Sequence, residues 1–318
     1  MLKSVAKKMI RLVQDRALPI PTSNETAALS ELQATFLKLP VLETTSVVPS
    51  EATWFGNMNR LRELVLNSDP REFLRWDVIQ KTMFVAYSDY LYKELKYLKH
   101  LADWKTRWHD AIKESSAGHP TPFVFYPASS GNLIHHAYHV AQFEEKTEIH
   151  VDKMDCILEF GGGYGSMCRL FHTLGFKGKY VIFDLPSFSG LQKYYLKTLG
   201  IPVQSGVDFM NCKSGVVCVS DIQQLKVLLK DHFTKRNTMF VGTWSISESP
   251  VSVRDSVIPL ISEFQAFLIA YQDRFAEVDN TVYFDNWKRS VQNVTWHNWR
   301  IQHIPNSDYL IGNVTSAL

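Results

Sequence analysis

Residues 157–165 read Ile157-Leu158-Glu159-Phe160-Gly161-Gly162-Gly163-Tyr164-Gly165. The apolar residues that begin this run predict a buried strand over residues 156–160, and the amphipathic stretch after it predicts a helix over residues 165–174. A glycine-rich turn between a strand and a helix presents backbone N–H groups and a helix N-terminus at the carboxyl edge of a sheet, where ligands of open α/β folds bind. We expect glycines there because a Cβ would block the close approach of a ligand. The run therefore predicts both a fold class and a ligand site.

Short apolar runs and longer amphipathic stretches alternate after this turn, which predicts a parallel sheet flanked by helices. Further strands are expected over residues 180–183, 216–219, 239–241 and 266–270, with helices over residues 187–199, 221–233 and 252–262. The last stretches, residues 281–284, 296–301 and 309–311, alternate apolar with polar residues and predict antiparallel strands that close the sheet. The expected fold is thus α/β and Rossmann-like, mostly parallel, with antiparallel C-terminal strands.

The region before the sheet has a different pattern. Apolar residues recur at helical spacing over residues 54–109, and the segments 118–122 and 127–131 are rich in proline, glycine and serine. We therefore expect the chain to have two parts. Residues 1–130 form a mainly helical region that acts as a lid or interaction surface, and residues 131–318 form an α/β domain. A new helix is predicted to begin near Asn132.

The residues around the turn favour one cofactor. A dinucleotide fingerprint would need glycine at position 166, where Ser166 stands, and no Gly-Lys-Ser/Thr run follows a glycine loop. Glu159 can receive the amino group of a methionine moiety, and Asp184, which ends the second strand, can accept hydrogen bonds from ribose hydroxyls. The sequence thus predicts S-adenosylmethionine as the cofactor. Asp221 either meets the adenine or caps the next helix. The expected cofactor contacts are Glu159, Gly161, Gly162, Gly163, Tyr164, Gly165, Asp184, Leu185, Asp221 and Thr243.

Four blocks of sequence carry a family resemblance. They are Gly131-Asn132-Leu133-Ile134-His135-His136-Ala137-Tyr138-His139, the glycine run with its strand, Ile182-Phe183-Asp184-Leu185-Pro186, and Thr243-Trp244-Ser245-Ile246-Ser247-Glu248. In combination, from about residue 54 to the C-terminus, the chain resembles the sugar O-methyltransferases of bacterial surface-polysaccharide gene clusters. The resemblance implies a class I methyltransferase sheet. It also implies a sugar hydroxyl as the acceptor, on a nucleotide sugar or a glycan.

A sugar hydroxyl must lose its proton during methylation, so a base is expected beside the cofactor. Glu248 is the first candidate, although it can instead cap the following helix. A histidine of the expected helix after residue 131, His136 or His135, and a histidine of the C-terminal segment, His303 or His297, are the other candidates, against the alternative that they are hydrogen-bonded structural histidines. His135 and His139 have the i, i+4 spacing of metal ligands, but no third ligand is indicated, so no metal is expected.

The composition of the chain limits which classes of partner are expected. The chain has 34 basic and 32 acidic residues and a net charge of +2, so neither nucleic acid nor an anionic membrane is an expected partner. The sequence has no apolar stretch long enough for a transmembrane segment. Its four cysteines form no Cys-x-x-Cys pair, which favours a reducing cytoplasm. Residues 1–20 form a basic amphipathic pattern, either a docking helix or a membrane-surface or targeting segment. The helical half could also bury a homodimer interface.

Other functions remain open at this point. The chain could methylate nitrogen or carbon of a small molecule, or be a silent cofactor-binding module that regulates a partner glycosyltransferase. A nucleotide-sugar dehydrogenase is disfavoured by Ser166.

Overall fold

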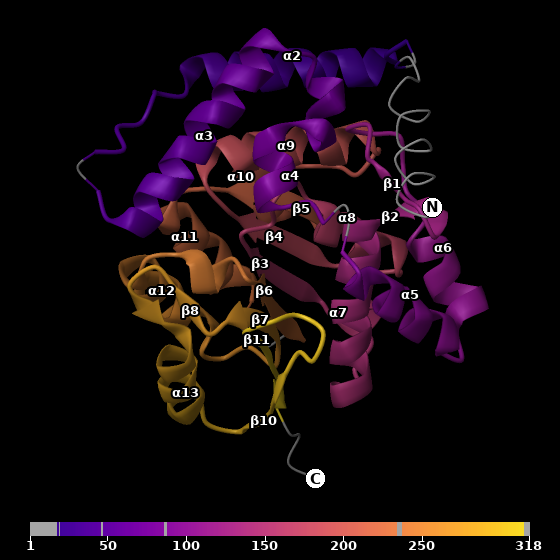
Figure 1. The fold of residues 1–318 in the computed structure, drawn as a ribbon. Helices are drawn as coiled ribbons and strands as arrows, with labels where there is room; N and C mark the ends of the chain where they lie inside the picture. Colours follow the sequence, from indigo (N-terminus) through magenta and orange to yellow (C-terminus); the bar gives the residue numbers. More distant parts are fainter. Residues whose placement is uncertain (1–17, 19, 46, 86–87, 234–236, 315–318) are drawn as a thin grey trace.

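The computed structural model describes residues 18, 20–45, 47–85, 88–233 and 237–314 (Figure 1). The basic pattern predicted over residues 1–20 falls almost wholly outside the described residues. None of the helices in the described part of the chain is long and apolar enough to cross a membrane.

A seven-stranded sheet in the order β10-β11-β7-β6-β3-β4-β5 forms the centre of the molecule. Five neighbouring strands, from β7 to β5 in this order, run parallel, and β11 runs antiparallel to both β7 and β10. This confirms the predicted α/β fold with antiparallel C-terminal strands. The strands are β3 (Cys156–Phe160), β4 (Lys179–Phe183), β5 (Gly215–Val219), β6 (Thr238–Thr243), β7 (Ala266–Gln272), β10 (Val294–Arg300) and β11 (Ser307–Val314).

Helices cover both faces of the sheet because successive strand residues point to opposite sides. Ile157 belongs to a core cluster with residues of α7 (Gly131–Thr147), α8 (Ser166–Thr173) and α9 (Pro186–Thr198). Its neighbour Leu158 belongs to a second cluster on the other face. That face is covered by α10 (Gly206–Asn211), α11 (Ile222–His232), α12 (Val251–Val257), η5 (Ile258–Ile261) and α13 (Asn280–Ser290).

The chain reverses direction across the sheet at β3. It runs outward through β4 and β5 and then returns to β6, so that β3 lies between β4 and β6. The connections leave β3 and β6 on opposite sides, and this switch point opens a crevice at the carboxyl ends of the strands.

The predicted helical character of the region before the sheet is confirmed. The α2 helix (Ser23–Lys38) packs on α9 so closely that a Cβ on Gly190 would lie 2.9 Å from the Phe36 ring. Residues from both sides of position 130 share one core cluster. The remaining elements of this region are α3 (Pro49–Asn67), η1 (Pro70–Arg75), α4 (Asp77–Thr82), α5 (Tyr90–His100), η2 (Trp104–Trp108), α6 (His109–Ala111), β1 (Pro122–Phe123) and β2 (Tyr126–Ser130).

One prediction was wrong. Residues 281–284, expected as a strand, lie in α13. The side chain of Asp279 accepts a hydrogen bond from the backbone N–H of Val282 and so caps the helix, which buries Phe284 and Trp287 one turn apart on the same face. Four residues of alternating polarity are too few to separate the two structures.

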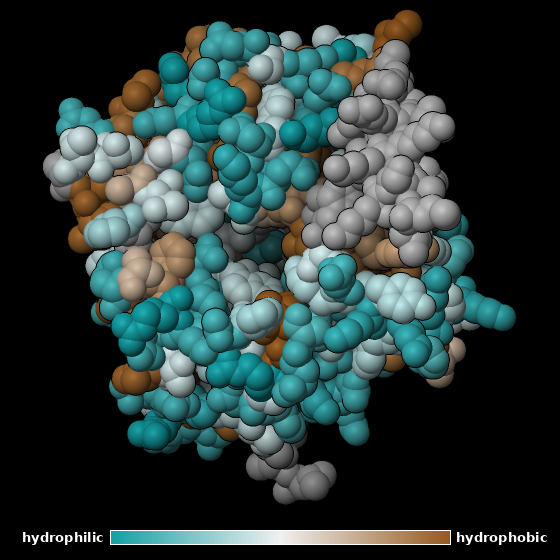
Figure 2. Space-filling model, viewed as in Figure 1, coloured by the Kyte–Doolittle hydropathy of each residue, from teal (hydrophilic) through white to brown (hydrophobic). Residues whose placement is uncertain are grey.

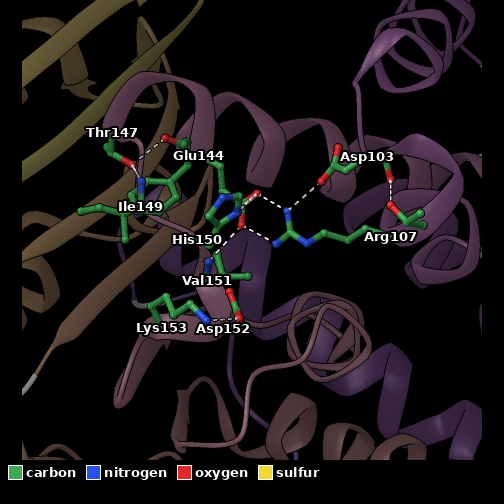
Figure 3. A network of polar contacts seen from close by, with 11 residues as sticks. Asp103, Arg107, Glu144, Thr147, Ile149, His150, Val151, Asp152 and Lys153 are labelled. Carbon is green, nitrogen blue, oxygen red and sulfur yellow. Dashed lines mark hydrogen bonds and ion pairs between the residues drawn. The ribbon is translucent and has the colours of Figure 1, made fainter.

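The α7 helix is tied down at both ends. The Ser130 hydroxyl accepts from the Leu133 N–H at 3.1 Å and caps its start, close to the predicted position. Near its end, the buried Glu144 carboxylate accepts two hydrogen bonds from Arg107, at 2.5 and 2.6 Å, and a third from the Val151 N–H at 2.9 Å (Figure 3). His150 lies 3.3 Å from the same carboxylate. These contacts hold in place the helix that carries His135, His136 and His139.

Candidate functional site

A cavity of about 640 Å³ lies at the carboxyl ends of the parallel strands. Phe160, Phe183 and Thr243, which end β3, β4 and β6, all line it. Figure 2 shows a hollow near the middle of the molecular surface, where Figure 1 places β3 and β4. The other walls come from α3, the segment before α5, α7 and the loop after β6.

The glycine loop is shaped by the fold itself. Gly161 has a φ of +69°, and a Cβ there would lie 2.3 Å from the Cβ of Ser245. A Cβ on Gly162 would lie 2.5 Å from Ile182. Both glycines are therefore required by contacts inside the protein, in addition to the approach of a ligand that the sequence suggested.

Two acidic residues face the cavity beside this loop. Glu159 is buried, accepts a hydrogen bond from the Tyr180 hydroxyl at 2.9 Å, and has its pKa raised to about 8 by burial. Asp184 accepts from the backbone N–H of Leu185 at 2.7 Å and of Gly163 at 3.1 Å, and burial raises its pKa to about 7.

These residues suit a cofactor with a cationic end and a ribose. No lysine or arginine is among the described residues that line the cavity, so Glu159 has no cationic partner there. An ammonium group would supply one. Asp184 stands at the end of the adjacent strand, on the same cavity and beside the same loop. This donor set is chemically compatible with S-adenosylmethionine.

Three other predicted cofactor residues also line the cavity. Thr243 does so from the end of β6, and Leu185 does so from the N-cap of α9. Tyr164 contributes to the wall while its hydroxyl accepts from the Asn132 side chain at 2.9 Å, so its polar end is already engaged.

Two predicted cofactor residues have structural roles outside the wall. Gly165 takes a φ of +96° at the N-cap of α8. Asp221 is exposed, and its side chain accepts from the Gln224 N–H at 2.7 Å as the N-cap of α11. Neither belongs to the residues that line the cavity, whereas Ser220, next to Asp221, does. For Asp221 the geometry corresponds to the capping alternative.

The three expected bases are placed differently. Glu248 lines the cavity, its carboxylate accepts only a long 3.4 Å contact from Gln272 among the described residues, and burial raises its pKa to about 7. His136 lines it too, but burial lowers its pKa to about 3 and its Nδ1 has no hydrogen-bond partner among the described residues. His303 is not in the wall; its Nε2 lies 2.9 Å from Glu94.

Sequence reasoning missed Glu94. Its carboxylate is fully buried, at 0% exposure, and Nδ1 of His135 lies 2.9 and 3.0 Å from its two oxygens. Burial acts to raise the pKa of Glu94, but His135 and His303 together hold it below its ordinary value. In sequence it is one glutamate among lysines on an amphipathic helix, and nothing local marks it.

The α3 wall was missed as well. Glu51, Trp54 and Phe55 lie at i, i+3 and i+4 on this helix, and all three line the cavity. The Trp54 indole N–H donates to the backbone carbonyl of Glu248 at 3.3 Å, joining this wall to the loop after β6. No group of three or more histidine, cysteine or acidic side chains within the described residues is arranged to hold a metal ion.

Comparison with known proteins gives a likeness in fold. No family model matches the chain. No curated protein matches it in sequence. The methyltransferase domain of bacterial CtHen1 is 10% identical, covering 58% of this chain and 99% of that one, with a TM-score of 0.42. The S-adenosylhomocysteine-bound methyltransferase PaMTH1 of Podospora anserina is 11% identical, covering 72% and 89%, with a TM-score of 0.35.

A third structure is magnesium protoporphyrin IX methyltransferase of Synechocystis PCC 6803. It is 9% identical, covering 57% of this chain and 83% of that one, with a TM-score of 0.37. The strand order and register of the present chain establish its α/β fold independently of these structures.

Proposed function

We propose that this protein is an S-adenosylmethionine-dependent O-methyltransferase that acts on a sugar hydroxyl. One observation carries the proposal. A single cavity brings together the glycine loop, the acidic residues Glu159 and Asp184, and groups able to take a proton.

The cofactor end of the cavity has a role for each polar group. Glu159 would hold the amino group of the methionine moiety, and Asp184 would hold the ribose hydroxyls. Gly163, whose N–H is directed to Asp184, keeps the loop beside that carboxylate. Leu185 and Thr243 line the remainder of this end.

The cofactor supplies a methyl group activated by sulfonium. The chain must place the acceptor oxygen in line and remove its proton. Correct positioning supplies on the order of 7–11 kcal/mol of the barrier reduction, and a positioned base adds about 10²- to 10⁴-fold in rate.

The other walls favour an uncharged sugar. Trp54, Phe55 and Trp244 offer rings against which a sugar face can stack, and Glu248 can accept from a hydroxyl. Arginine and lysine are the side chains that hold phosphate groups by charge-assisted hydrogen bonds, and the described lining residues include neither. A glycan-borne or free sugar is therefore favoured over a nucleotide-linked one.

The first test is calorimetric titration with S-adenosylhomocysteine, beside NADH. We expect the former alone to bind, with about tenfold weaker affinity in Asp184→Asn, because a hydrogen bond to a charged group is lost. Asp208→Asn, an exposed carboxyl outside the cavity, is the matched control. Binding of NADH alone would overturn the cofactor assignment.

The second test follows labelled methyl transfer to methyl glycosides, to the matching sugar phosphates and to small amines. Transfer to glycosides supports the proposal. Transfer to amines alone would indicate N-methylation, and cofactor binding without transfer to any acceptor would favour the silent regulatory module.

A further inference from the structure

Glu94 and His135 form a buried carboxylate–histidine pair that opens onto the cavity. Both carboxylate oxygens of Glu94 lie within 3.0 Å of Nδ1 of His135. A carboxylate accepts hydrogen bonds, so this geometry places the ring proton on Nδ1. The lone pair of the neutral ring is then on Nε2, and no described residue donates a hydrogen bond to that atom.

Aromatic rings contact the imidazole ring of His135, and the ring of His139 lies against it at a centroid distance of 4.1 Å. Trp244 stacks on the His135 ring at a centroid distance of 5.5 Å and an angle of 29°, and Tyr90 lies on it at 5.4 Å. Trp244 has a φ of +62°, which is strained for a bulky residue. Its backbone N–H donates to Ala270 at 2.6 Å and holds this conformation. Backbone strain of this kind recurs where a side chain must be held in one place for function.

The pair lies beside the cofactor end of the cavity. Trp244 follows Thr243 directly at the end of β6, and both residues line the cavity together with His135 and the glycine loop. An acceptor between the glycine loop and α7 would therefore meet the free nitrogen of His135.

The structure assigns His135 as the base that takes the proton of the acceptor hydroxyl, with Glu94 as the residue that positions it. This inference rests on the proposed function and replaces Glu248, His136 and His303 in the role of base. In the step, the hydroxyl proton passes to Nε2 of His135 while the acceptor oxygen bonds to the methyl carbon and the carbon–sulfur bond breaks. The sulfonium becomes a neutral thioether, and the new positive charge rests on the imidazolium next to Glu94. Release of this proton to water restores the site.

The three earlier candidates lack one or more of these features. Among the described residues His136 has no carboxylate partner, and burial disfavours its charged form. His303 contacts Glu94 but is outside the cavity wall. Glu248 lies on the α3 side, where it is better placed to orient the acceptor by accepting from a second hydroxyl.

The test uses diethylpyrocarbonate, which acylates imidazole nitrogens that carry a free lone pair. The full chain is treated at pH 7, and mass spectrometry identifies the modified histidines and measures the rate at which each is acylated. We expect His135 to react at Nε2. In Glu94→Gln the side-chain amide can donate a hydrogen bond to Nδ1, which moves the ring proton to Nε2. The rate of acylation of His135 should then fall about tenfold, because losing a hydrogen bond to a charged group shifts an equilibrium by about this much.

Two further variants separate a specific loss of His135 reactivity from a folding defect. Glu94→Asp keeps a carboxylate and should retain most of the reactivity. Glu145→Gln removes an exposed carboxylate of α7 outside the pair and should leave it unchanged. An unreactive His135 in the wild type, or equal rates in Glu94→Gln with circular dichroism preserved, would overturn the assignment. Titration with S-adenosylhomocysteine judges the proposed function separately, because neither residue is assigned to the cofactor.

Discussion

The two ends of the cavity hold their polar groups in different ways. At the glycine loop, the Asp184 carboxylate accepts hydrogen bonds from the backbone N–H groups of Leu185, its neighbour, and of Gly163, 21 residues away. On the α7 side, His135 is 41 residues from Glu94, and Glu94 is 209 residues from its second partner, His303.

The difference shows which part of the site depends on the whole fold. The glycine loop and the two acidic residues of the cofactor end come from one short part of the chain, since Glu159 and Asp184 sit at adjacent strand ends. Thr243 and Ser245, at the end of β6 and in the loop after it, complete this end. The α7 end exists only when α5, α7 and the loop before β11 have all docked. We therefore expect perturbations of α7 to alter stability and the histidines while leaving cofactor affinity intact, and perturbations of the glycine loop to weaken cofactor binding.

The largest expected effect is on the anchor of α7. Arg107→Ala leaves the buried Glu144 carboxylate without its bidentate partner, and breaking a buried pair costs about 3–5 kcal/mol. The free energy of unfolding, measured by urea titration, should fall by this amount, while S-adenosylhomocysteine affinity in the folded protein stays constant.

Arg300→Ala is the matched control for Arg107→Ala. The Arg300 side chain is 46% exposed and pairs with Asp273 at 2.7 Å, so we expect a loss of about 1 kcal/mol or less. Equal losses in the two variants, or weaker cofactor binding in Arg107→Ala, would remove the distinction between the two ends.

A smaller loss, this time in binding, is expected at the glycine loop. Gly161→Ala places a Cβ on a residue with a φ of +69° and drives it against Ser245 at 2.3 Å. Strain of about 1–3 kcal/mol together with the displaced loop should weaken S-adenosylhomocysteine binding by roughly 30- to 100-fold. Calorimetry on the folded variant measures this.

Gly200 provides a control with the same backbone conformation. Its φ is +74°, but a Cβ there would meet nothing within 4 Å. Gly200→Ala should lower stability slightly and leave cofactor affinity unchanged. If Gly161→Ala bound as well as this control, the loop would not be part of the cofactor site.

The same division explains what the sequence could predict. The sheet and the cavity-lining positions of Glu159 and Asp184 follow from local patterns of apolar runs, glycines and acidic residues, and the structure places them as expected. Glu94 and Trp54 could not be found, because their partners lie 41 and 194 residues away and hydropathy carries no information about such pairs. For Asp221 the local pattern offered two roles, and only the hydrogen bond to Gln224 separates them.

The smallest expected effect concerns the proton on Glu159. With a pKa of about 8, this carboxyl is mostly protonated at pH 7 in the free protein. An ammonium group favours the ionised form, so S-adenosylhomocysteine binding at pH 7 should release up to one proton and should strengthen as the pH rises toward 8. Calorimetry in phosphate and in Tris, whose ionisation enthalpies differ, measures the proton count.

The sign for stability is opposite. Between about pH 4.5 and pH 8 the folded protein keeps a proton on Glu159 that the unfolded chain has lost, so this residue makes the free energy of unfolding fall as pH rises. Glu159→Gln should lower the proton release, flatten that slope and weaken binding about tenfold. Tyr180→Phe, which removes the 2.9 Å hydrogen bond but keeps the carboxyl, should still release the proton. Binding without proton release in the wild type would mean that the ammonium group is held elsewhere in the cavity.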